Sequence, residues 1–127
     1  MLDTDSVSYA IRGAGRVADQ IVTHPPSELC ISAITLAELR YGAERRGSRK
    51  LHRAIESFAG SVRVVAFDGE CAVTYGRIGA KLAARGEVIG ETDTLIAAHA
   101  LTLSVTLVTN NERHFSRVPA LRIVNWF

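Results

Sequence analysis

The chain has 127 residues, 47% of them hydrophobic and 22% charged, which is enough for one domain with a buried core and excludes an intrinsically disordered protein. Its 15 lysines and arginines nearly balance 13 acids, and a formal net charge of +2 excludes a protein that coats nucleic acid through bulk positive charge. All of these cations except Lys50 and Lys81 are arginines, whose guanidinium groups match phosphate and carboxylate oxygens. The placement of single charges is therefore more informative than their sum.

Short apolar runs alternate with helical patterns along the chain. The runs predict strands at residues 1–4, 29–33, 62–67, 105–109 and 121–125. Because these runs are apolar almost throughout, they are typical of strands buried on both faces. Helical patterns lie near residues 6–23, 34–46, 48–59, 69–86 and 93–103. This alternation predicts a single α/β domain over residues 1–127, with a mainly parallel sheet of four or five strands.

The two cysteines give a further expectation. Cys30 and Cys71 have no metal-binding spacing, and Cys30 lies in an apolar run. We expect both to be reduced core residues of a cytoplasmic protein, with a disulfide as the alternative. No stretch approaches the roughly 20 apolar residues of a membrane span, and the acidic start of the chain is unlike a secretory signal peptide. No membrane association is therefore expected.

Polar and acidic residues follow the predicted strands, at the edge of a parallel sheet where ligands usually bind. They are Asp3 and Asp5, Thr35 and Glu38, Asp68 and Glu70, Glu91 and Asp93, and the segment from Thr109 to Glu112. Any one of them is explained by helix capping, worth about 1 kcal/mol. Asp68 is expected to be only a cap, and Thr35 and Glu38 have the spacing of a capping box. Several carboxylates at one edge nevertheless exceed what capping requires.

Carboxylates that converge need a counter-ion. Two of them about 5 Å apart repel by roughly 3 kcal/mol at an effective dielectric near 20. Mg²⁺ or Mn²⁺ removes that cost and prefers oxygen ligands, whereas the four scattered histidines give no zinc pattern. A carboxylate-held cation beside arginines indicates phosphate chemistry, in which the metal activates water and neutralises charge at phosphorus.

Four segments, in chain order, resemble the motifs of PIN-domain ribonucleases. They are residues 1–8 (MLDTDSVS), 31–42 (ISAITLAELRYG), 93–100 (DTLIAAHA) and 107–115 (LVTNNERHF), the last followed by residues 117–119 (RVP) and Trp126. The resemblance spans essentially the whole chain. Together the segments are similar to the toxin branch of that family, the VapC-type toxins of type II toxin–antitoxin modules.

The resemblance implies a Rossmann-like, three-layer α/β/α fold and Mg²⁺- or Mn²⁺-dependent hydrolysis of RNA phosphodiester bonds. The implied substrates are structured RNAs, most often tRNA, whose cleavage inhibits translation and growth. It also implies a homodimer, neutralised by a small VapB-type antitoxin in complexes that bind promoter DNA through the antitoxin. Carried over by position, Asp3, Glu38 and Asp93 match the three acids that hold the metal and serve catalysis.

The first motif departs from the family pattern in two ways. Asp5 stands where the family often has Asn, so it either adds charge to the site or caps a helix. Only Met1 and Leu2 precede Asp3, where the family usually has a longer apolar strand. We therefore expect a short first strand, or a chain whose true start lies slightly upstream.

The fourth motif departs as well. Asn111 falls where many members have Asp, and His114 falls where toxin relatives often have Glu. Glu112 is a candidate substitute for the missing acid, and Thr109 is expected to form a hydrogen bond within the site. These positions are auxiliary candidates beside the three acids.

A basic stretch follows the second motif. Its six cations lie within fourteen residues: Arg40, Arg45, Arg46, Arg49, Lys50 and Arg53. The stretch is interpreted as a contact surface for RNA or antitoxin, and a solvated helix face is an equal alternative. Because only 6% of the residues are aromatic, RNA shape rather than base stacking is the expected determinant.

Two other functions stay open. Asp3 and Asp5 satisfy the Asp-x-Asp opening of haloacid-dehalogenase-type phosphatases, in which Asp3 would be a nucleophile. That fold needs a suitably placed lysine and a later acid pair, and Lys50 and Lys81 are poor candidates. The imperfect fourth motif favours the second alternative, a PIN-like domain that binds without cleaving.

Overall fold

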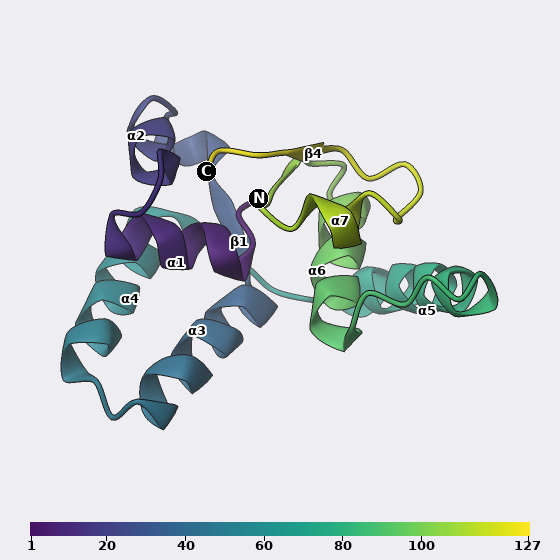
Figure 1. Ribbon diagram of the computed structural model, residues 1–127, viewed down its shortest axis with the longest axis horizontal. Helices are drawn as coiled ribbons and strands as arrows, with labels where there is room; N and C mark the ends of the chain where they lie inside the picture. Colours follow the sequence, from purple (N-terminus) through teal and green to yellow (C-terminus); the bar gives the residue numbers. More distant parts are fainter.

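The computed structural model describes residues 1–127, with seven α-helices, one 3₁₀ helix and four short strands (Figure 1). The helices are α1 (Thr4–Arg12), α2 (Val17–Val22), α3 (Ala33–Arg45), α4 (Arg49–Ser61), α5 (Gly69–Ala84), α6 (Glu91–Thr102) and α7 (Glu112–Phe115). The 3₁₀ helix is η1 (Pro26–Glu28), and the strands are β1 (Cys30–Ser32), β2 (Arg63–Val65), β3 (Leu107–Val108) and β4 (Ile123–Val124).

The sheet is parallel and is organised around Leu2. Strand β1 pairs in parallel with β2, and β3 pairs in parallel with β4. Leu2 joins the two pairs, because it forms parallel bridges to Ile31 on one side and to Val108 on the other. The spatial order is therefore β2-β1-Leu2-β3-β4, which confirms the predicted parallel α/β fold and the short first strand.

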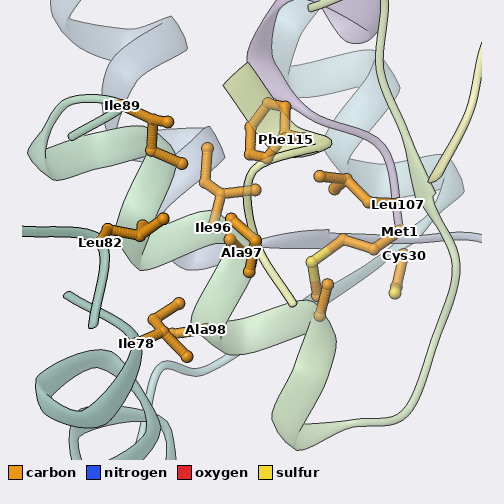
Figure 2. Packing of buried hydrophobic residues seen from close by; sticks show 12 residues of the cluster. Met1, Cys30, Ile78, Leu82, Ile89, Ile96, Ala97, Ala98, Leu107 and Phe115 are labelled. Atoms are coloured by element: carbon orange, nitrogen blue, oxygen red, sulfur yellow. The ribbon is translucent and has the colours of Figure 1, made fainter. Parts of the chain in front are cut away.

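Buried side chains from the central strands pack on both faces of the sheet. Met1, Cys30 and Leu107 belong to the cluster of α5, α6 and α7, which Figure 2 shows around Ile96 and Phe115. The residues that follow them in the sequence, Leu2, Ile31 and Val108, belong to a second cluster with side chains from α1, α3 and α4. Since successive residues of a strand point to opposite faces, the helices form a layer on each side. Figure 1 shows α1 to α4 on one side of the molecule and α5 to α7 on the other.

The edge strands differ from the prediction that all strands are buried on both faces. Arg63 and Val64 of β2 are exposed, and so is Val124 of β4. Each of these strands has a neighbour on one side only, so part of its surface meets solvent. All four strands are also shorter than the apolar runs, because the flanking residues continue into loops.

The predicted helix over residues 6–23 is wrong in its extent. Asp3 caps α1 by accepting a hydrogen bond from the Ser6 backbone N–H at 2.7 Å, so the helix begins at Thr4. It ends at Gly13, which has a φ of +64° and suits a left-handed C-cap. Helix α2 then starts separately at Val17. The four-residue helix α7 was not predicted, because it is too short for a periodic pattern.

Cys30 and Cys71 are both buried and unpaired, as the sequence predicts. Asp68 is the N-cap of α5 and accepts a hydrogen bond from the Cys71 backbone N–H at 3.1 Å, which confirms its role as a cap. No helix combines the length and apolar character required to cross a membrane.

Candidate functional site

Asp3 lies at the carboxyl end of the central strand segment and is the most buried of the candidate acids, with 4% of its surface exposed. Burial raises the pKa of Asp3, and hydrogen bonding by the Thr109 hydroxyl and by Ser6 offsets this only in part. The carboxylate has no ion-pair partner in the chain. An added cation would therefore compensate a buried negative charge.

Glu38 lies on α3, across from the start of α1. The hydroxyl of Thr4, the residue after Asp3, donates a hydrogen bond to Glu38 Oε2 and so connects the two acid-bearing segments. The predicted capping box is wrong: Ser32 is the N-cap of α3, and its hydroxyl accepts from the Ile34 backbone N–H at 3.0 Å. Thr35 is instead fully buried within the helix, and its hydroxyl has no partner.

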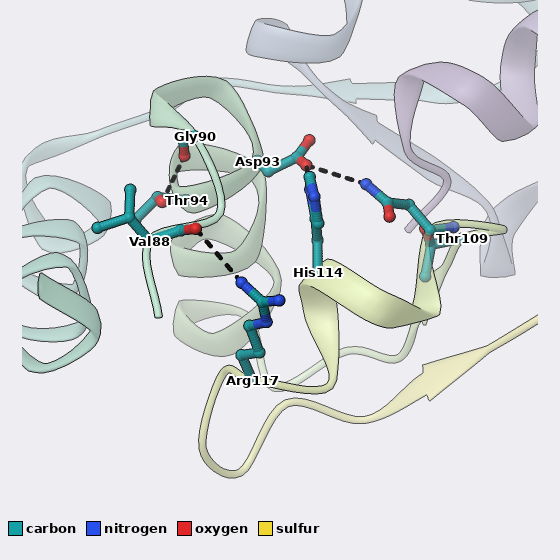
Figure 3. Close-up of polar contacts among 8 residues, drawn as sticks. Val88, Gly90, Asp93, Thr94, Thr109, His114 and Arg117 are labelled. Carbon is teal, nitrogen blue, oxygen red and sulfur yellow. Dashed lines mark hydrogen bonds and ion pairs between the residues drawn. The ribbon is translucent and has the colours of Figure 1, made fainter. Parts of the chain in front are cut away.

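Asp93 lies in the first turn of α6 and faces the segment that follows β3. Its Oδ2 atom is 2.8 Å from His114 Nδ1 and 3.2 Å from Asn111 Nδ2. Figure 3 shows the His114 ring next to the Asp93 carboxylate. The backbone N–H of Asn111 donates to the buried hydroxyl of Thr109 at 2.9 Å. The Thr109 hydroxyl also lowers the pKa of Asp3, so a chain of polar groups leads from Asp3 past Thr109 and Asn111 to Asp93.

The structure sorts the other candidates. Asp5 is exposed in the first turn of α1, and its charge adds a small upward contribution to the pKa of Asp3. Asn111 and His114 reach Asp93. Glu112 instead accepts a hydrogen bond from the Asn125 side chain at 2.8 Å, so it is engaged with the C-terminal segment.

The donor set suits a hard divalent cation, although it is not assembled as a closed centre. No three His, Cys, Asp or Glu side chains lie close enough to hold a metal ion together. Mg²⁺ is commonly held by one or two carboxylates while water fills its other positions. The uncompensated carboxylate of Asp3 and the half-buried one of Asp93 match that requirement in donor type. The residues present therefore fit such an ion in chemistry, with wide spacing between the acids.

A groove opens beside Glu38, between α1, α3 and α4. Its polar lining includes Glu38, Thr4 and Ser8, and two arginines, Arg12 and Arg46. Arg12 was missed by the sequence analysis, because its approach to Glu38 arises only from the packing of α1 against α3. Arg46 is the one cation of the predicted basic stretch that lines the groove. The remaining members lie outside that lining: Arg40, Arg45, Arg49, Lys50 and Arg53.

A buried hydrogen bond connects the helices that carry Asp93 and Glu38. His99 of α6 is fully buried, and its Nδ1 lies 2.8 Å from the hydroxyl of Ser32, the cap of α3. Phe67 contacts the imidazole ring edge-on, with the ring centroids 5.6 Å apart. Burial lowers the pKa of His99, and the nearby Asp68 charge opposes that shift.

Known proteins resemble this chain over nearly its whole length. The family described as "PIN domain" matches residues 1–121. The tRNA(fMet)-specific endonuclease VapC of Salmonella typhimurium is 37% identical over 99% of this chain and 96% of its own length. Ribonuclease VapC2 of Haemophilus influenzae is 39% identical with the same coverage.

Solved structures give the same result. VapBC2 from Rickettsia felis, bound to a DNA fragment from its promoter, matches with a TM-score of 0.91 and 32% identity, over 100% of this chain and 98% of that one. DNA-bound VapBC from Salmonella typhimurium matches with a TM-score of 0.90 and 36% identity, over 100% and 97%. The chain therefore belongs to the PIN-domain family, and within that family to the VapC group.

Proposed function

We propose that the chain is the toxin of a toxin–antitoxin module and acts as a metal-dependent endoribonuclease. Its substrate is structured RNA, with tRNA as the first candidate, and cleavage inhibits translation. The observation that carries this proposal is the polar chain from Asp3 to Asp93 at the carboxyl end of the sheet. Relatives named as a tRNA(fMet)-specific endonuclease and a ribonuclease support it, because they match nearly the whole chain.

Asp3, Glu38 and Asp93 are the residues that we propose to hold Mg²⁺ or Mn²⁺, one or two of them directly and the rest through water molecules on the ion. The bound ion supplies an activated water and neutralises charge that develops on the phosphate. Asp3 is fixed by the backbone N–H of Ser6, whereas Glu38 is held by the Thr4 hydroxyl. Asp5 is exposed in the first turn of α1 and adds negative charge near Asp3.

The groove beside Glu38 is the proposed path of the RNA backbone. Arg12 and Arg46 line it and would bind phosphate oxygens next to the acids. The outer cations would extend the positive surface around the groove: Arg40, Arg45, Arg49 and Lys50. Arg45 lies over the ring of exposed Tyr41, 5.8 Å from its centroid, which keeps that guanidinium near the surface of α3.

We propose a VapB-type antitoxin as the partner of a homodimer, in an assembly that contacts promoter DNA through the antitoxin. Solved VapBC relatives, two of them DNA-bound, support this proposal. The chain would work as a single PIN domain over residues 1–127 in the cytoplasm, where tRNA is found.

The test uses the purified chain without antitoxin, incubated with total RNA or tRNA and Mg²⁺ or Mn²⁺. Discrete fragments are expected, and they should disappear with EDTA and in the Asp3→Asn and Asp93→Asn variants. Asp68→Asn is the matched control, since Asp68 caps α5 outside the site and Asn is an equally good cap. A folded, antitoxin-free preparation that binds RNA without cutting it would favour the non-cleaving alternative and overturn the proposal.

A further inference from the structure

The two oxygens of the Asp93 carboxylate have different environments. Oδ2 is contacted by both His114 Nδ1, at 2.8 Å, and Asn111 Nδ2, at 3.2 Å. No protein group forms a hydrogen bond with Oδ1. An ionised carboxylate only accepts hydrogen bonds, so the imidazole contributes an N–H from Nδ1. Two donors on one oxygen fix the rotation of the carboxylate and leave the other oxygen free.

We propose that His114 and Asn111 are positioning residues, which hold Oδ2 of Asp93 so that Oδ1 is the oxygen presented to the divalent cation. This inference rests on the proposed function, since it needs Asp93 to bind that cation. Carboxylate ligands in metal sites are commonly held by hydrogen bonds of this kind. Both donors come from the segment after β3, so that segment sets the direction of a carboxylate carried by α6.

Charge explains why donors suit these two positions. A carboxylate at position 114, within hydrogen-bonding distance of Asp93, would repel it until a cation arrived. An imidazole N–H and an amide attract Asp93 instead, so its orientation is set before the ion binds. A nitrogen that donates its hydrogen has no free lone pair, so His114 Nδ1 acts through Asp93 rather than as a ligand.

The experiment measures Mn²⁺ binding by the whole chain, using the electron paramagnetic resonance signal of the free aquo-ion during a titration. His114→Leu removes the donor and should weaken Mn²⁺ binding by about 10- to 100-fold, the usual effect of losing such a contact. His114→Asn places an amide N–H near the former Nδ1 and should restore affinity to within about threefold of wild type. Asn111→Leu tests the second donor and should also weaken binding.

His52→Leu is the control. His52 lies on α4, where its Nε2 is 3.5 Å from a carboxylate oxygen of Glu44. The His52→Leu substitution should therefore leave the Mn²⁺ affinity unchanged. Thermal melting in EDTA checks that each variant folds. His114 and Asp93 side chains are 39% and 29% exposed, so neither Leu nor Asn at position 114 opens a core cavity.

A pulsed measurement on bound Mn²⁺ separates positioning from direct ligation. The wild-type spectrum should contain no ¹⁴N coupling from a coordinated imidazole, and such a coupling that disappears in His114→Leu would overturn the positioning role. Equal Mn²⁺ affinity in wild type and both leucine variants would overturn this inference alone. Failure of the wild type to bind Mn²⁺ at all would overturn the metal site and the proposed function with it.

Discussion

Asp3 and Asp93 lie at the two ends of one polar chain and are held in opposite ways. Asp3 is buried, caps its own helix and is bonded by the backbone of Ser6. Asp93 is partly exposed and is held by the side chains of two residues from a separate segment. The first carboxylate cannot be redirected without losing the N-cap of α1, whereas the orientation of the second depends on the side chains at positions 111 and 114. The fold thus fixes the orientation of the Asp3 carboxylate, whereas the orientation of the Asp93 carboxylate depends on neighbouring side chains.

The largest expected effect comes from exchanging each acid for its amide. Asp3→Asn and Asp93→Asn should each reduce RNA cleavage at least about 100-fold, because a charged metal ligand is lost. Their stabilities should differ: Asp3→Asn keeps the cap and removes a buried charge, so it should raise the free energy of unfolding in EDTA by about 0.5–2 kcal/mol. Asp93→Asn should change it little. Cleavage assays and urea unfolding in EDTA check both statements.

The effect of Mn²⁺ on thermal stability provides a control for the Asp3→Asn and Asp93→Asn variants. Millimolar Mn²⁺ should raise the melting temperature of the wild type, because the ion binds only the folded chain. The increase should disappear in Asp3→Asn. An Asp3→Asn variant that is less stable than wild type in EDTA would contradict the view that the Asp3 charge is uncompensated.

The connection between the two acid-bearing helices gives the next effect. Ser32→Ala removes the cap of α3 and the partner of buried His99, so it should cost about 2 kcal/mol of unfolding free energy. Ser48→Ala is a matched control, because Ser48 caps α4 through Leu51 and has no second partner; it should cost about 1 kcal/mol. Equal losses, measured by urea unfolding, would mean that the His99 contact adds nothing.

The same buried imidazole predicts a pH dependence. Burial lowers the pKa of His99 in the folded chain, so the unfolded chain binds its proton first as the pH falls. The stabilisation is therefore complete above about pH 6.5, the ordinary value for histidine, and is lost as the pH drops below it. The loss has an upper limit of about 1.4 kcal/mol per pH unit. Urea unfolding from pH 8 to pH 5 should show this slope in wild type and a smaller one in His99→Asn.

The smallest effect concerns the groove. Arg46→Ala should lower RNA affinity a few-fold and reduce the slope of log K against log salt by about 0.7, as expected for one lost phosphate contact to a single strand. Arg53→Ala, outside the groove lining, should leave that slope unchanged. Binding titrations at several salt concentrations, with the inactive Asp93→Asn chain, provide the measurement. Equal slopes for both arginine variants would remove the groove from the proposed RNA path.

The sequence predicted the α/β class from its alternation, and the resemblance supplied the three acids. It did not predict the way each acid is held. The contact of His114 and Asn111 with one oxygen of Asp93 depends on how the segment after β3 crosses the start of α6. Glu112 lies in the same segment, and the path of that segment brings its side chain to Asn125 instead of Asp93. Such contacts join residues far apart in the chain, where periodicity carries no information.

The local structure also contains some features that the sequence predicted and others that it did not. Caps at Asp3 and Asp68 involve residues three positions apart, so they were within reach of sequence rules. The break between α1 and α2 depends on the positive φ angles of Gly13 and Gly15, which helical spacing alone does not reveal. The strands were overestimated in length because the apolar runs continue beyond the paired segments into loops and, at Ala33, into a helix.

The position of Leu2 between β1 and β3 has a consequence for the order of assembly. Its neighbour Asp3 donates a backbone hydrogen bond to the carbonyl of Val108 at 3.0 Å, and Leu2 pairs with Val108 itself. Leu2 and Asp3 therefore wait for a segment that is synthesised much later than they are before the sheet closes. Until the sheet closes, nothing holds Asp3 and Asp93 in a defined arrangement, so the nascent chain contains both acids but no assembled site.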